Sequence, residues 1–121
     1  IRFTYLYNSR ILLVVFLHFD DYSSLSKTTY ANNPLIVAIQ RNKVVATTRQ
    51  NSLGISNVTV PISGTTFIEN KTSTVDILMT NDGYLIYIDQ VYICFSQHVL
   101  PYTITRYIKL VLQGQVYELS V

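Results

Sequence analysis

The chain has 121 residues, of which 49% are hydrophobic and only 13% are charged, and its formal net charge is +2. This length and composition predict one domain with a substantial core, and the scattered lysines and arginines form no basic stripe of the kind that binds nucleic acid. The longest apolar run, from Ile11 to Leu17, is too short for a membrane-spanning helix.

Short segments rich in Val, Ile, Tyr, Thr and Phe follow one another along the chain, separated by turn residues, which is typical of a β-sandwich or barrel. Strands are predicted over 1–7, 11–19, 34–40, 43–49, 56–62, 74–80, 84–89, 91–95, 104–112 and 115–121. Asparagine and glycine in the intervening turns favour tight antiparallel hairpins. The segment 22–34 lacks apolar alternation and is predicted to be the longest loop, so an all-β fold of antiparallel strands follows.

The segment 11–19 provides the first candidate site, because successive residues of a strand point to opposite faces of the sheet. One alternating set is apolar throughout, and the other becomes polar towards its end, at His18, Asp20 and Tyr22. We therefore expect these three side chains to share an open face. The interior is expected to contain Leu13, Val15, Leu17, Phe19, Ile108, Leu110 and Leu112.

Several motifs along the chain resemble those of galectins. The run from His18 to Tyr22 is similar to the galectin pattern H-F-N-P-R, Val60 to Ile62 to F-P-F, and Leu110 to Val116 to the closing L-x-I-x-G-D-V hairpin. The resemblance covers 1–121 as one domain. It implies a galectin-like, concanavalin A-like jelly-roll sandwich of two antiparallel sheets, with a galactoside groove on its concave face.

The galectin groove uses a His, an Asn and an Arg on one strand, an Asn on the next, and then a Trp and a Glu. Carried over by position, the resemblance predicts the ligand-binding residues His18, Asp20, Tyr22, Gln40, Leu53 and Ser56. The second Asn falls on Ile39, or on Gln40 if the register slips by one residue. Because the chain contains no tryptophan, lactose is expected to bind poorly. Two functions follow: recognition of a different glycan or glycoprotein, or a scaffold for protein contacts.

The resemblance also implies one or two strands before the position of Ile1. We therefore expect the strand over 1–7 to lie at a sheet edge, or to pair with a protein partner or an upstream segment that completes the sandwich. Galectins are often cytosolic and exported without a signal peptide, but the sequence leaves the localisation of this chain open.

An enzymatic function is not predicted. Asp20 and Asp21 are adjacent, so on a strand they point to opposite faces and cannot act as a paired acid and base. No nucleophile motif is present. Cys94 is the single cysteine, and His18 and His98 have no obvious third ligand, so neither a metal site nor a cofactor is predicted. Cys94 is expected to be a small buried hydrophobic residue.

Overall fold

The computed structural model describes residues 1–6, 12–18, 33–50, 53–62, 71–100, 105–112 and 115–120. These residues form ten strands: β1 (Arg2–Leu6), β2 (Leu12–His18), β3 (Asn33–Ile39), β4 (Lys43–Gln50), β5 (Leu53–Pro61), β6 (Thr72–Met79), β7 (Gly83–Ile88), β8 (Val91–Gln97), β9 (Thr105–Leu112) and β10 (Gln115–Ser120). Each coincides with one of the predicted strands, which confirms the all-β prediction. The described residues include no helix capable of crossing a membrane.

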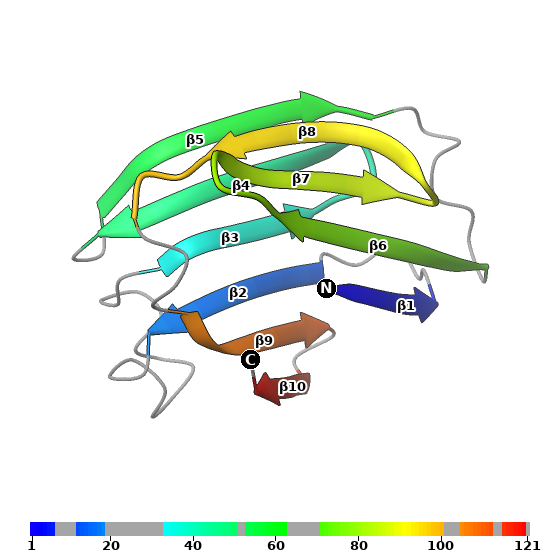
Figure 1. Ribbon diagram of the computed structural model, residues 1–121. Helices are drawn as coiled ribbons and strands as arrows, with labels where there is room; N and C mark the ends of the chain where they lie inside the picture. Colours follow the sequence, from blue (N-terminus) through cyan, green and yellow to red (C-terminus); the bar gives the residue numbers. More distant parts are fainter. Residues whose placement is uncertain are drawn as a thin grey trace.

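The strands form two antiparallel sheets that pack face to face (Figure 1). The smaller sheet has the order β1-β6-β7-β8, and the larger has the order β10-β9-β2-β3-β4-β5. All pairings between the described strands are antiparallel. The predicted two-sheet antiparallel sandwich is therefore confirmed.

The core lies between the two sheets and is built largely by alternation along the strands. In β7, Tyr84, Ile86 and Ile88 are buried, while the residues between them are only half-buried. The buried hydrophobic residues are Leu35, Val37, Ile39, Val44, Ala46, Val75, Ile77, Tyr84, Ile86, Ile88, Cys94 and Ile108. Cys94 is buried as predicted, and desolvation raises the pKa of its thiol, so the cysteine stays protonated and acts as a small apolar residue.

The predicted interior positions on β9 are correct where the structure describes their side chains. Ile108 is buried, and Leu110 is half-buried against the core cluster. Phe19 lies outside the described residues.

The backbone register places the predicted interior set on β2 one residue out of step with the buried positions of β3, while the side chains of β2 lie outside the described part of the structure. Val14 is the register partner of the fully buried Val37, whereas Val15 is the partner of the half-buried Ile36 on the other face. Leu13 and Leu17 alternate in step with Val15, so all three occupy register positions of the outer face. The physical reason is that both alternating sets of this strand are apolar up to residue 17, so the sequence pattern does not distinguish its two faces.

The two sheets differ in width, and the difference lies at one side of the sandwich. β8 contacts β5 and β4, so the smaller sheet is aligned with the β5 edge of the larger one. Six strands are wider than four at the same spacing, and the larger sheet therefore extends beyond β1 towards β9 and β10 (Figure 1). Among the described strands β1 lies at a sheet edge, as predicted for the segment 1–7.

Candidate functional site

The described residues of the predicted binding site all belong to the larger sheet or to the turns that join its strands. His18 is the last residue of β2, Gln40 follows β3, and Leu53 and Ser56 belong to β5. Asp20 and Tyr22 lie outside the described residues.

The turn between β3 and β4 separates Gln40 from the other predicted residues. The backbone amide of Gln40 donates a hydrogen bond to the backbone carbonyl of Lys43 at 2.9 Å, which places Gln40 next to the beginning of β4. Leu53 pairs with Gln50 at the opposite end of β4. Seven residue steps along an extended strand span roughly 23 Å, so Gln40 does not share a site with Leu53. Ile39, the alternative position, is buried in the core.

His18 lies at the same end of the sheet as β5's first residues. β2 and β3 are antiparallel and pair from Leu12 opposite Ile39, so the end of β2 runs towards Asn33. Asn33 pairs with Arg49, and Arg49 pairs with Gly54. The pairing of β2 with β9 shifts by one residue between Leu17 and His18, which leaves Arg106 of β9 as the extra residue.

A β-bulge on β5 affects the two predicted residues of that strand. Thr48 pairs with Ser56 but the next residue, Arg49, pairs with Gly54, which leaves Ile55 as the extra residue. Thr48 is buried, and its hydroxyl donates to the Pro34 carbonyl at 3.0 Å, so Ser56 occupies a register position of the core side. Leu53 is 68% exposed and offers an apolar surface at this end of the sheet.

Arg49 is a candidate that the sequence analysis missed. It alternates with the buried Thr48 and Ala46, which places it on the outer face with Thr47 and Val45. The sequence over 44–49 has three apolar residues followed by three polar ones and gave no alternation signal for Arg49. Only the strand order shows that Arg49 lies between β3 and β5, at the end shared by His18 and Leu53.

His98 lies at the end of the smaller sheet and does not belong to this site. Its Nε2 lies 2.6 Å from the Thr80 carbonyl oxygen, and its ring packs edge-on against Tyr84 at a centroid distance of 4.6 Å. These contacts fix the segment after β8 against the turn between β6 and β7. Within the described ranges, no cluster of three or more His, Cys, Asp or Glu side chains is suited to a metal ion.

Comparison with known proteins gives a match at the level of structure. No family model matches the chain, and no curated protein matches its sequence. Sheep galectin-11, solved in complex with glycerol, superposes with a TM-score of 0.63 at 12% identity, covering 98% of this chain and 96% of that one. Two variants of human galectin-16 superpose with a TM-score of 0.63 at 11% identity, covering 100% of this chain and 95% of theirs. The chain has the galectin fold.

The galectin fold is thus present without a close sequence relationship to these galectins. At 11–12% identity, individual side chains in the binding region are not inherited with the fold. The galectin-fold architecture fixes which strands are neighbours, while the chemistry of its outer faces depends on the residues of this chain alone.

Proposed function

We propose that the chain is a non-catalytic, galectin-fold lectin module that recognises a glycan other than lactose. The proposed groove lies at the end of the larger sheet where β2, β4 and β5 carry His18, Arg49 and Leu53. The observation that supports it best is that the strand order places these three positions at one end of a single sheet. Asp20 and Tyr22 remain proposed ligand-binding residues on the segment that follows His18.

The composition of this region supports an altered specificity. A tryptophan plane that could stack on the apolar face of galactose is absent from the chain, and Leu53 offers no π-surface in its place. Ser56 is paired with the core-facing Thr48, so a serine there does not replace a glutamate in the groove. A site that orients a sugar by hydrogen bonds loses affinity steeply when those partners are removed.

Lactose is therefore expected to bind with a dissociation constant weaker than about 1 mM, whereas a glycan array on the intact chain is expected to identify at least one different ligand. Isothermal titration calorimetry measures the lactose affinity directly. His18→Ala is expected to abolish binding to the glycan found on the array, because His18 is the one polar residue of the galectin groove pattern that this chain keeps.

Gln40→Ala is the matched control for His18→Ala. Gln40 was predicted for the same site but lies at the other end of β4, so its substitution should leave glycan binding unchanged. Saturable lactose binding below about 1 mM would contradict the proposed specificity, and a blank array would contradict the lectin function itself.

A second candidate function, assembly through the β1 edge, is favoured by the unequal width of the two sheets. Ile1 exchanges both backbone hydrogen bonds with Ile77. In an antiparallel ladder such bonded pairs alternate, so Phe3 is also bonded to β6, while the amides of Arg2 and Thr4 point to the free edge. An added strand at this edge would lie over the part of the larger sheet that extends beyond β1.

Assembly through this edge predicts concentration-dependent association of the intact chain in analytical ultracentrifugation. Thr4→Pro removes a free-edge amide without removing a bond to β6, and proline is tolerated at strand edges. The substitution is therefore expected to weaken association by about tenfold, the effect of about one strand hydrogen bond. A monomer at every concentration, for wild type and variant alike, would exclude this assembly.

A further inference from the structure

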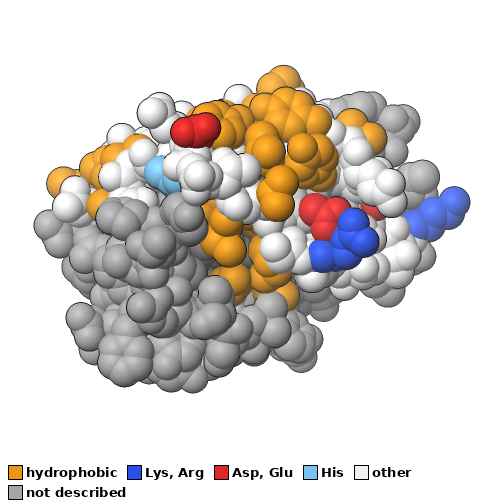
Figure 2. Space-filling view, in the orientation of Figure 1, with side chains coloured by type: hydrophobic (Ala, Val, Ile, Leu, Met, Phe, Trp, Pro, Cys, Tyr) orange, Lys and Arg blue, Asp and Glu red, His pale blue; other side chains and the backbone are white. Residues whose placement is uncertain are grey.

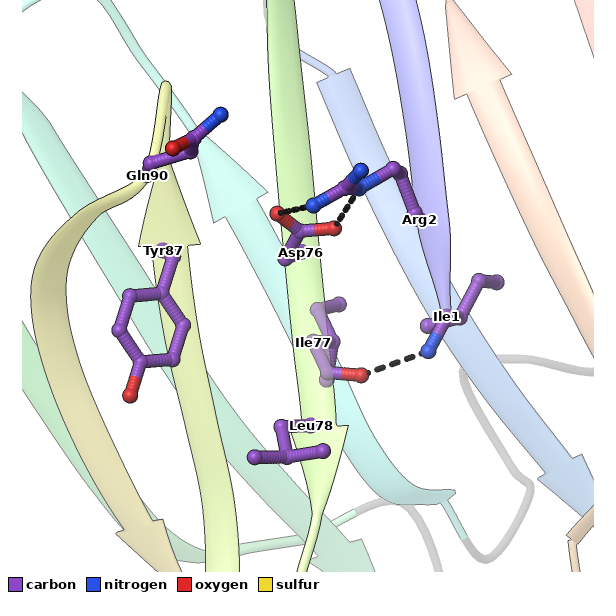
Figure 3. Close-up of a pocket in the computed structure, with 7 residues that line it drawn as sticks. All are labelled: Ile1, Arg2, Asp76, Ile77, Leu78, Tyr87 and Gln90. Atoms are coloured by element: carbon purple, nitrogen blue, oxygen red, sulfur yellow. Dashed lines mark hydrogen bonds and ion pairs between the residues drawn. The ribbon is translucent and has the colours of Figure 1, made fainter.

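The outer face of the smaller sheet contains a cavity of about 550 Å³ between β1, β6 and β7 that is largely open to solvent. Its walls are formed by Ile1, Arg2, Asp76, Ile77, Leu78, Tyr87 and Gln90 (Figure 3). This cavity belongs to the smaller sheet and the proposed groove to the larger one, so it forms a separate site, and the inference drawn from it does not depend on the proposed function.

Strand alternation and register bring these residues together. In β6, Val75 and Ile77 are buried, which turns Asp76 and Leu78 to the outer face. Asp76 is the register partner of Arg2 on one side and of Tyr87 on the other. One row across the sheet therefore carries a cation, an anion and an aromatic ring.

The polar end of the cavity is a two-point ion pair. Arg2 Nε lies 2.6 Å from Asp76 Oδ1, and Arg2 Nη2 lies 3.2 Å from Asp76 Oδ2. The hydrogen bond from Arg2 lowers the pKa of Asp76, so the carboxylate stays ionised at neutral pH. The Arg2 side chain remains 66% exposed. The pair therefore presents donors and acceptors side by side with no net charge, and Gln90 adds an amide at the rim (Figure 3).

The other end of the cavity is apolar. Leu78 is 52% exposed, and the Tyr87 ring lies beside it (Figure 3). Tyr87 is held edge-on by Tyr92, with a centroid distance of 5.9 Å. In the space-filling view, exposed hydrophobic side chains gather directly beside the ion pair (Figure 2). The aromatic wall is thus fixed by a neighbouring ring and remains accessible from solvent.

We propose that this cavity is a binding site for a neutral saccharide. Adjacent ring hydroxyls each donate and accept, which matches the neighbouring Arg2 donors and Asp76 acceptors. The C–H face of the ring packs against Tyr87 and Leu78, where an apolar surface is already exposed. A carboxylate or phosphate would meet the Asp76 charge, and a cation would meet Arg2, so a ligand with net charge fits less well.

Two-dimensional ¹H–¹⁵N NMR of the intact chain tests this site. Methyl glycosides of glucose, galactose and mannose are added at tens of millimolar, with acetate and methylguanidinium as charged probes. At least one glycoside is expected to shift the amides of Asp76, Tyr87 and Gln90 in a saturable way. Asp76→Asn and Arg2→Gln are each expected to weaken that binding by about tenfold, since each removes charge-assisted hydrogen bonds.

Thr4→Val is the matched control, because Thr4 lies on the same strand and face as Arg2 and contacts Thr74 at 3.3 Å outside the cavity. It should leave the affinity unchanged. The proposal is overturned by larger shifts at these amides with either charged probe, by unchanged affinity in both folded variants, or by the absence of any glycoside effect on these amides. Shifts confined to the larger sheet would likewise overturn it while supporting the proposed groove.

Discussion

Replacing Ile77 with alanine is expected to lower the free energy of unfolding by about 2–5 kcal/mol. Ile77 is fully buried in β6, between the strands β1 and β7 of the smaller sheet. Truncation removes apolar contacts and leaves a cavity that the neighbouring buried side chains Tyr84 and Ile86 cannot fill without moving. Urea denaturation followed by circular dichroism measures the change.

Leu78→Ala provides the comparison, since it removes the same number of carbon atoms one position along the same strand. Leu78 is 52% exposed on the outer face, so its loss should cost no more than about 1 kcal/mol. Equal costs at the two positions would mean that β6 does not present Ile77 to the core, and the assignment of the two faces of the smaller sheet would be wrong.

Gly83→Ala is expected to destabilise the fold by about 1–3 kcal/mol or more. Gly83 begins β7 and is buried. A Cβ atom at this position would collide with the Ser96 carbonyl oxygen and would lie 2.6 Å from the Phe95 ring. The Phe95 ring can rotate away, but the carbonyl belongs to the ladder between β7 and β8, so the backbone has to move. Thermal unfolding of the purified variant reports the loss as a lower Tm.

Two further variants distinguish crowding against the β8 backbone from crowding against the Phe95 side chain. Gly54→Ala should be close to neutral, because the nearest atom to its Cβ would be Thr47 Cγ2 at an ordinary 3.7 Å. Adding Phe95→Ala to Gly83→Ala should not restore stability, since the carbonyl contact remains. Full rescue by the second substitution would show that the ring, and not the β8 backbone, excludes a side chain at position 83.

The strands were predictable from sequence because alternation and turn residues agree along most of the chain. In β7 the alternating set Tyr84, Ile86 and Ile88 is apolar and is bounded by a turn on each side, so both the strand and its buried face follow from the pattern. β2 is different, since Val14 and Val15 are equally apolar and either set could face the core. Only the register with β3 distinguishes them.

The candidate site was only partly predictable, for reasons of topology. Spacing along the chain places Gln40 between His18 and Leu53 but does not show that a hairpin carries Gln40 to the far end of β4. The Arg2–Asp76 pair joins residues 74 positions apart. It exists because β1 pairs with β6, and no local pattern in the sequence encodes that pairing.

The back-to-back packing of the two sheets has a consequence for how such a module would act in solution. Its outer faces point in opposite directions and are held apart by a close-packed core. Recognition on both faces would make a single chain divalent, able to cross-link two glycan-bearing surfaces without a partner subunit. Because the two faces point away from each other, one surface cannot present ligands to both faces at once. The geometry therefore favours bridging between two surfaces over avidity on one.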